Sequence, residues 1–233
     1  MTVPALAEFL KSSPAFAALG PRDVQALATV AREERVRARD YIFMEGDPAR
    51  WFCLVKTGHV KILRQARSGR DVVLELLGPG EPFGGVAVIE RRPYPASAQA
   101  TEPTVVTKIP QAVIAALVER HPSIVREIAL MIGRRLRAAH ESVTSLAGDP
   151  VEARLAGALV RLAEREGVRT GGRVMLPFPL TRQNLADMTA TTVETAIRVL
   201  SRWQRGGLVV EDSGYLVLPD VEAVRALADG ADT

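Results

Sequence analysis

The chain has 233 residues, 47% of them hydrophobic and 24% charged, and a net charge of +3 at neutral pH. This length allows one large domain or two small ones, and the composition is that of an ordinary globular protein rather than a disordered or fibrous one. The sequence has no unbroken apolar stretch of about 18 residues and no signal-peptide pattern over residues 1–16. We therefore expect a cytoplasmic protein with no membrane partner.

Catalytic and metal-binding patterns are not found in the sequence. The three histidines, His59, His121 and His140, are scattered, and we find no phosphate-binding loop, no Ser/His/Asp arrangement and no metal-spaced cluster. The single cysteine, Cys53, excludes an iron–sulfur cluster with four cysteine ligands, and its apolar strand predicts an inert core thiol rather than a redox sensor. The sequence predicts a protein that is not an enzyme and has no certain metal site.

The first half of the chain is predicted to contain a short helix and then antiparallel strands. Apolar residues recur at helical spacing over residues 14–31. From residue 41 to 109, short apolar runs alternate with glycine and proline, a pattern typical of an antiparallel sandwich or barrel. The runs are 51–55, 60–63, 72–77 and 105–109.

A long helix is predicted from Pro122 to the helix-breaking sequence Gly148-Asp149-Pro150. Five of its apolar positions step by four and three residues, as in the a/d seam of a two-helix coiled coil, so we expect a homodimer. The alternative is an amphipathic helix that packs only on its own domain. The expected dimer-interface residues are Ile132, Leu136, Ala139, Val143 and Leu146.

The last part of the chain predicts a winged helix-turn-helix. One helix is expected over residues 151–166, a second over 181–188, a turn over 189–191 and a third helix over 193–204, ended by two glycines. Two runs, 208–211 and 215–218, are predicted to form a β-hairpin around Ser213-Gly214. Two helices joined by a tight turn and followed by a hairpin are typical of proteins that read double-stranded DNA.

The third helix carries residue types suited to reading base edges. Glu194 can accept a hydrogen bond from cytosine N4, and Arg198 can fork onto guanine O6 and N7 one turn later. Residues 150–210 contain nine basic and five acidic residues, which favours contact with phosphates. An alternative for Glu194 is a capping box with Thr191 as the cap. The other expected DNA-binding residues are Thr181, Arg182, Gln183, Thr192, Thr195 and Arg202.

Four segments in this order resemble the cAMP receptor protein and fumarate–nitrate regulator (CRP/FNR) superfamily of transcription regulators. Residues 45–61 are similar to the start of its β-roll, 78–84 to its ligand-binding cassette and 121–136 to its dimerisation helix. The fourth segment is the recognition helix, in which Thr192-Val193-Glu194-Thr195 followed by Arg198 is closer to the fumarate–nitrate and nitric-oxide-sensing branches than to the cAMP-binding branch.

The resemblance implies an α+β fold in three parts. These are a sensor β-roll of the cupin-like double-stranded β-helix type over 1–121, a dimerisation helix over 122–148 and a winged helix-turn-helix over 149–233. It also implies a homodimeric regulator, an activator or a dual-acting protein, that contacts RNA polymerase. In such proteins the residues matching Glu194 and Arg198 read a TGA core in each half of a palindrome. Val193 and Ile197 replace residues that read outer bases in other branches, so no outer-base preference carries over.

The same resemblance makes cAMP an unexpected effector. The ribose-binding Glu of the family falls on Gly85 and the phosphate-binding Arg near Tyr94-Pro95, while its two adenine-binding hydroxyl residues fall on Ala139 and His140. The cassette is similar to that of members that sense redox state or nitric oxide, some through haem, and His140 is a candidate haem ligand or a solvated histidine. The expected effector pocket consists of Gly84, Gly85, Val86, Tyr94, Pro95, Ala96, Ala139 and His140.

Two further interpretations stay open at this point. The protein can be a regulator that is active as the bare dimer and needs no effector. Alternatively, it can be a ligand-binding module that acts on a protein partner, although the predicted helix-turn-helix argues against that.

Overall fold

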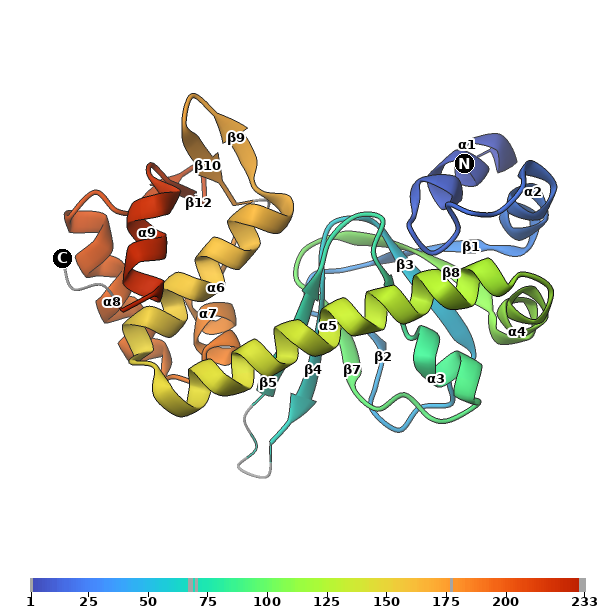
Figure 1. Ribbon diagram of the computed structural model, residues 1–233, viewed down its shortest axis with the longest axis horizontal. Coiled ribbons are helices and arrows are strands. Elements are labelled where there is room, and N and C mark those ends of the chain that lie inside the picture. The colour runs from blue at the N-terminus through green and yellow to red at the C-terminus, as the bar shows by residue number, and fades with distance from the viewer. Residues whose placement is uncertain (1, 67–68, 70, 177, 231–233) are drawn as a thin grey trace. The chain divides into compact units, whose positions relative to one another are not determined.

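The computed structural model of the protein describes residues 2–66, 69, 71–176 and 178–230 (Figure 1). The chain forms two compact units, one of Met1–Ser68 with Leu74–Arg137 and one of Gly69–Val73 with Ala138–Thr233. The long helix α5 contributes to both. The predicted boundary at residue 149 coincides with the end of α5, whereas the compact units divide within this helix. No helix of the described residues is long and apolar enough to cross a membrane.

The N-terminal helices differ from the single helix predicted over residues 14–31, and that prediction is corrected. The structure has two helices, α1 (Val3–Ser12) and α2 (Pro21–Val30), and residues 14–18 between them form turns. Gly20 is extended, with φ −71° and ψ 159°, because the ring of a following proline disfavours the helical region. Pro21 then starts α2, since a proline at the first helical position loses no hydrogen bond.

The central part of the N-terminal unit is a β-roll of two four-stranded sheets. The four predicted strands are confirmed, and four more are present that the sequence pattern missed. The first sheet has the order β1 (Arg32–Val36), β8 (Thr104–Pro110), β3 (Trp51–Thr57) and β6 (Pro82–Phe83). The second has the order β2 (Tyr41–Phe43), β7 (Ser97–Ala100), β4 (Val60–Gln65) and β5 (Asp71–Leu77).

Side chains from both sheets meet in a shared core. Cys53 and Val55 of β3 pack in one cluster with Val60 of β4 and Ala98 of β7. Antiparallel pairing fixes this arrangement, because β3 lies against β8 with Cys53 opposite Lys108. The two sheets of the roll therefore share one buried core.

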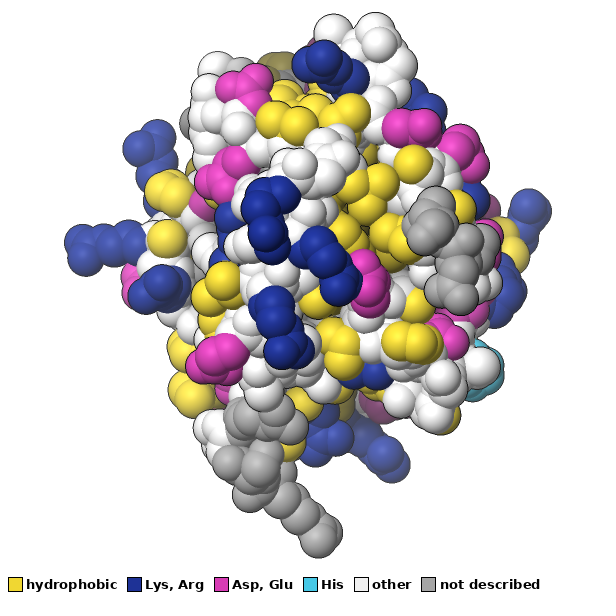
Figure 2. Space-filling view, turned by 90° about the vertical axis from the view of Figure 1, so that its left-hand side faces the viewer, with side chains coloured by type: hydrophobic (Ala, Val, Ile, Leu, Met, Phe, Trp, Pro, Cys, Tyr) yellow, Lys and Arg dark blue, Asp and Glu magenta, His cyan; other side chains and the backbone are white. Residues whose placement is uncertain are grey.

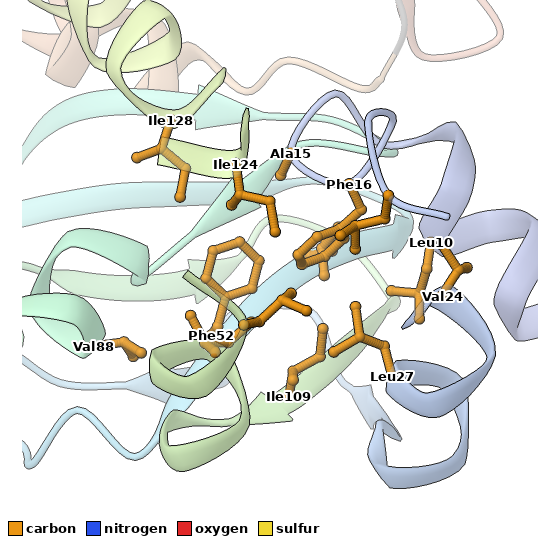
Figure 3. Close-up of a cluster of buried hydrophobic side chains, with 14 of the residues drawn as sticks. Leu10, Ala15, Phe16, Val24, Leu27, Phe52, Val88, Ile109, Ile124 and Ile128 are labelled. Carbon is orange, nitrogen blue, oxygen red and sulfur yellow. The ribbon is translucent and has the colours of Figure 1, made fainter. Parts of the chain in front are cut away.

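A second hydrophobic cluster joins the N-terminal helices, the roll and the start of α5 (Pro122–Gly148) (Figure 3). Figure 3 shows Ile124 and Ile128 of α5 near Phe16 and Phe52. Two short helices, α3 (Gly85–Glu90) and α4 (Gln111–Arg120), add Val88 and other residues to this cluster. The first two turns of α5 are thus anchored in the N-terminal unit.

The predicted seam of α5 is confirmed as helical and lies on a solvent-exposed face. Leu136 is 53% exposed and Val143 is 65% exposed, and the other seam residues are also exposed. At about 100° per residue, the centre of the seam lies roughly 60° around the helix from the mean direction of Ile124 and Ile128. The alternative of a helix buried on its own domain therefore holds for the first two turns and not for the seam.

The C-terminal unit contains the predicted winged helix-turn-helix. The helices α6 (Val151–Glu166), α7 (Arg182–Met188) and α8 (Val193–Arg205) and the hairpin of β11 (Val210–Asp212) and β12 (Tyr215–Leu218) are all present. A four-stranded sheet orders the wing as β11-β12-β10-β9. The sequence pattern missed β9 (Val168–Thr170), β10 (Arg173–Met175) and α9 (Val221–Ala228).

Candidate nucleic-acid interface and effector region

Threonine caps set the start of both helices of the helix-turn-helix. The Thr181 hydroxyl accepts a hydrogen bond from the Asn184 backbone N–H at 3.1 Å at the start of α7. The Thr192 hydroxyl accepts from the Thr195 backbone N–H at 3.2 Å at the start of α8. Threonine is favoured at this position because its side chain replaces a missing helical hydrogen bond. The caps fix where the recognition helix begins.

The turn between α7 and α8 contains a residue in the left-handed region. Ala190 has φ +47°, a conformation that non-glycine residues seldom adopt. The Thr191 N–H donates to the Ala186 carbonyl at 3.0 Å, and the Thr189 hydroxyl donates to the Leu185 carbonyl at 2.7 Å. These bonds keep the turn short, so that α8 leaves it at a defined angle.

Helix α8 has one buried face and one exposed face. Its buried residues, Ala196, Val199, Leu200 and Trp203, pack into the C-terminal unit. The opposite face is solvent-exposed, as the helical period of 3.6 residues requires. Its exposed residues are Glu194, Ile197, Arg198, Ser201, Arg202 and Arg205.

Glu194 lies at the N-terminus of α8 with its carboxylate in solvent. The helix cap is Thr192 rather than Thr191, so Glu194 is the second residue of the helix and the capping-box interpretation is wrong. Hydrogen bonds from its own backbone N–H and from the Thr192 hydroxyl lower the pKa of the Glu194 carboxyl. The side chain is therefore an ionised hydrogen-bond acceptor at neutral pH.

Arg198 is exposed one helical turn after Glu194. It makes no hydrogen bond or ion pair with another residue in the part of the chain that the structure describes. Residues at i and i+4 share a helix face, so the acceptor and the fork-shaped donor point to the same side. The structure thus brings together the two residues that the sequence predicts to read bases.

Two of the predicted phosphate-contacting arginines are engaged in ion pairs. Arg182 of α7 pairs with Glu211 of β11 at 2.6 Å, which connects the helix-turn-helix to the wing. Arg202 of α8 pairs with Glu152 of α6. Both arginines are at least 30% exposed, so each can still turn a face to solvent. Gln183 donates to Asp187 at 2.6 Å, on the surface of α7.

Glu152 positions the recognition helix and was not found from the sequence. One of its carboxylate oxygens accepts a hydrogen bond at 2.7 Å from the buried indole N–H of Trp203, and the other pairs with Arg202. This single carboxylate therefore fixes α8 against α6 at two successive residues. An indole N–H in a core needs such an acceptor, but the sequence pattern does not show which residue supplies it.

Ser201 and Arg205 extend the exposed face of α8, and they were also missed. They follow Glu194 and Arg198 by seven residues each, a spacing that returns to the same helix face. Figure 2 looks onto the side of the C-terminal unit and shows several Lys and Arg side chains gathered near the centre of the view. By its exposed residues, the outer face of α8 carries the three arginines Arg198, Arg202 and Arg205 and one acidic residue, Glu194, near its N-terminal end.

In the predicted effector region, aromatic rings fill part of the roll interior. Tyr94 is buried, its ring stacks on Phe43 with the centroids 3.6 Å apart, and its hydroxyl donates to the Trp51 carbonyl at 2.7 Å. The Trp51 N–H donates back to the Tyr94 hydroxyl at 3.1 Å, and burial raises the pKa of this phenol. Ala96 is buried beside it in sequence, whereas Val86 and Pro95 are exposed.

The two glycines of this region have different roles. Gly84 is the N-cap of α3 and lies in the left-handed region at φ +72°, a conformation that is strained for residues with a side chain. Gly85 has no room for a larger side chain, because a Cβ there would lie 2.8 Å from the Phe52 ring. An acidic residue at position 85, of the kind that holds a ribose, would therefore require Phe52 to move.

The predicted residues on α5 lie outside this packed region. Arg135 faces the roll, where it pairs with Glu75 at 2.7 Å and donates to the Pro82 carbonyl at 2.7 Å. Five residues later, His140 is turned by about 140° around the helix from Arg135 and is exposed, as is Ala139. Ala139 and His140 fall in the C-terminal compact unit.

The remaining candidate reactive groups, Cys53 and His59, are buried in this structure. Cys53 is fully buried, and desolvation raises its pKa to about 12, so the thiol stays protonated at neutral pH. His59 is also buried, and its Nδ1 lies 2.6 Å from a Glu102 carboxylate oxygen. Among the described residues, no group of three or more His, Cys, Asp or Glu side chains is arranged to hold a metal ion.

Comparison with known proteins agrees with both units. The cyclic nucleotide-binding domain family matches residues 33–121, and the Crp-like helix-turn-helix domain family matches residues 153–227. The cyclic AMP receptor protein of Thermus thermophilus is 29% identical over 221 residues, which cover 95% of this chain and 99% of that protein. The transcriptional activator protein Anr of Pseudomonas aeruginosa is 26% identical, over 89% of this chain and 85% of its own length.

The same architecture is found in solved structures. FixK2 from Bradyrhizobium japonicum superposes with a TM-score of 0.74 at 24% identity, over 85% of this chain and 97% of that one. A β-roll with a cyclic nucleotide-binding fold, a long helix and a helix-turn-helix together define a DNA-binding transcription regulator rather than an enzyme. The chain belongs to the CRP/FNR family of such regulators.

Proposed function

We propose that this regulator binds, as a homodimer, a palindromic DNA site with a TGA core in each half. The observation that carries the proposal is the shared exposed face of Glu194 and Arg198 at the start of α8. An ionised carboxylate can accept from cytosine N4, and a guanidinium can donate to guanine O6 and N7. The TGA core contains one G·C pair, which offers the guanine on one strand and the cytosine on the other.

Dimer formation is the second part of the proposal. The exposed seam from Ile132 to Leu146 supplies an apolar stripe on α5 that a second copy of the helix can cover. A two-fold axis along this seam would place two recognition helices about one helical turn of DNA apart, or 34–36 Å. This spacing explains why the site is expected to be a palindrome. Contact with RNA polymerase follows from the same family assignment and belongs to the proposal.

Binding of a palindrome can be tested with three variants. Fluorescence anisotropy at fixed salt would compare a duplex carrying two TGA cores with a scrambled duplex of the same composition. Glu194→Ala and Arg198→Ala are each expected to lose about 1–3 kcal/mol of binding to the palindrome and little to the scrambled duplex. Arg173→Ala, a change at an exposed arginine of β10, is the control for general loss of charge. The proposal is wrong if both variants bind the palindrome like the wild type.

For the effector, we propose a signal other than cAMP. Gly85 stands where a ribose-binding acid is expected, and Phe52 leaves no space for one. Tyr94 and Pro95 stand where a phosphate-binding arginine is expected, and a buried phosphate needs a cation. The cyclic nucleotide-binding domain of this chain is therefore expected to have lost that ligand. Addition of cAMP should leave the affinity for the palindrome unchanged, and a tenfold gain would contradict this.

Redox state, nitric oxide and haem remain the proposed signals to test. A visible spectrum of the purified protein with added haem tests whether the protein binds haem. A sharp stoichiometric Soret band that is lost in His140→Ala would support a haem sensor, whereas a flat spectrum would exclude one. The packed rings of Phe43 and Tyr94 favour a second candidate, a regulator that binds DNA as the bare dimer. In that case DNA affinity without any additive equals the affinity under every signal.

A further inference from the structure

One exposed apolar side chain interrupts the polar outer face of α8. Ile197 is 46% exposed, while Val199, Leu200 and Trp203 are buried. Within the described residues of α8, no other large hydrophobic side chain is exposed. Its neighbours on that face are the carboxylate of Glu194, the guanidinium of Arg198 and polar side chains further along. Packing inside the unit therefore does not account for an isoleucine at this position.

Ile197 lies among the residues proposed to read bases. It follows Glu194 by three residues, which places it about 60° around the helix and about 4.5 Å further along the axis. It directly precedes Arg198 and lies about 40° from Ser201. Ile197 is turned by about 100° from Arg198, so when Glu194 and Arg198 face base edges in the major groove, Ile197 lies at the flank of the same exposed face and can reach a neighbouring base edge.

The chemistry of the groove restricts what an isoleucine can contact there. The base edges present hydrogen-bond donors and acceptors, and the one apolar group among them is the C5-methyl of thymine. An isoleucine can neither donate nor accept, so contact with any other base edge would desolvate polar groups without replacing their hydrogen bonds. A β-branched side chain in a helix also has one strongly preferred χ1 rotamer, so little freedom is lost on contact.

We propose that Ile197 packs against the C5-methyl group of one thymine in each half-site and thereby selects a T·A pair. This inference rests on the proposed palindrome-binding function and adds a specificity determinant to it. Glu194 and Arg198 would read hydrogen-bonding groups, and Ile197 would read shape and hydrophobicity at a separate base pair. The half-site is then read at one more position than the two polar residues can reach.

The test replaces single methyl groups in the DNA. Each thymine of a half-site, on either strand, is replaced in turn by deoxyuridine, symmetrically in both halves, and affinity is measured by fluorescence anisotropy at fixed salt. Deoxyuridine keeps every hydrogen bond of thymine and lacks only the methyl. For the wild type we expect one position at which the loss is roughly fourfold per half-site, the value for burial of one methyl-sized group.

The matched protein variants show whether Ile197 is responsible. Ile197→Ala is expected to bind the thymine and deoxyuridine duplexes equally at that position, because the packing partner is gone. Ser201→Ala, a change on the same exposed face, is expected to keep the wild-type loss. Thermal unfolding of Ile197→Ala should match the wild type, since the side chain is exposed.

Three outcomes would overturn the inference. In the first, the wild type binds every deoxyuridine duplex as tightly as the thymine duplex. In the second, the loss of affinity caused by deoxyuridine is the same in Ile197→Ala as in the wild type. In the third, Ser201→Ala abolishes this loss as fully as Ile197→Ala does. An Ile197→Ala protein with unchanged DNA binding that no longer activates transcription would instead assign Ile197 to a protein contact. Failure of the wild type to prefer the palindrome over the scrambled duplex would refute the proposed function, a result separate from all of these.

Discussion

At the scale of single residues, some buried polar groups in this protein are bonded mainly by one side chain. The Tyr94 hydroxyl satisfies both the carbonyl and the N–H of Trp51, and the Glu152 carboxylate satisfies the indole of Trp203. A buried donor or acceptor that loses its partner costs about 1–3 kcal/mol, whereas a surface group costs little. Tyr94 and Glu152 therefore contribute more to the stability of their units than surface polar residues do.

Tyr94→Phe should destabilise the N-terminal unit by about 1–3 kcal/mol at pH 7, because the Trp51 N–H loses its bond to the hydroxyl and the Trp51 carbonyl keeps only the weak Cys53 thiol contact at 3.8 Å. The pKa of Tyr94 is raised by burial, so its stabilising effect is present below the unfolded pKa of about 10 and is lost as the pH rises above it. The difference in free energy of unfolding between the variant and the wild type should therefore shrink above pH 10. Urea unfolding across this pH range measures it.

The control for this variant is Tyr41→Phe, at a tyrosine that is 42% exposed. A surface change of this kind is expected to stay within about 0.5 kcal/mol of the wild type at every pH. Equal stabilities of Tyr94→Phe and wild type at pH 7 would show that the Tyr94 hydroxyl does not matter to the fold.

At the scale of elements, α5 combines an anchored start with an exposed seam. Ile124 and Ile128 are buried in the N-terminal unit, and the seam beyond them is covered by nothing within the described chain. Exposed apolar residues scattered over a surface are ordinary, but a continuous stripe over several helical turns is typical of an interface.

Leu136→Lys should separate the dimer, since it would place two unpaired charges in a two-fold seam. Loss of two buried leucine side chains alone corresponds to about 3–6 kcal/mol, or at least a hundredfold weaker association. Sedimentation velocity at micromolar concentration measures the change. Thr144→Lys adds the same charge to an exposed part of α5 away from the seam and should leave the dimer intact. If the Leu136→Lys protein is still a dimer, the dimer interface lies on another surface.

Strongly periodic elements could be predicted from the sequence, and weakly patterned ones could not. The long helix, the helix-turn-helix and four strands have clear apolar periods, and all of them are present. Strand β1 was missed because four of its five residues are exposed and polar, and β7 because its residues are small. These strands form because their neighbours β8 and β4 offer unpaired backbone, an influence that is invisible in a local pattern.

The candidate site was predictable to the same extent. Glu194 and Arg198 follow from helix spacing, and Ser201 and Arg205 follow from the same spacing carried two turns further. Arg182 and Arg202 were predicted as phosphate contacts from their charge alone. Their ion pairs with Glu211 and Glu152 join residues 29 and 50 positions apart in sequence, which only the tertiary fold brings together.

At the scale of the whole molecule, the sequence divides into regions that can be tested separately. The C-terminal unit has its own core, which includes Leu159, Phe178, Leu185, Leu200 and Leu218. It also has its own four-stranded sheet and contains the helices α6, α7, α8 and α9. Such a unit has what it needs to fold alone.

A fragment of residues 149–233 is expected to fold cooperatively and to bind a single half-site weakly. Without the seam of α5 it should remain monomeric, so its affinity should not depend on the spacing between two half-sites, whereas that of the full chain should. Circular dichroism during urea unfolding and anisotropy on duplexes of varied spacing measure both effects. A fragment without a cooperative transition would argue against a domain boundary at residue 149, and residues 138–233 would be the comparison.

The placement of the two tryptophans gives each half of the molecule its own optical reporter. Trp51 lies beside Tyr94 in the roll, and Trp203 lies in the recognition helix with its indole bonded to Glu152. Replacing either one by phenylalanine leaves a single emitter, whose wavelength and quenching then describe one half alone. Effector binding at the roll and DNA binding at the recognition helix can thus be followed as separate fluorescence signals. The order of the two events can then be resolved in time.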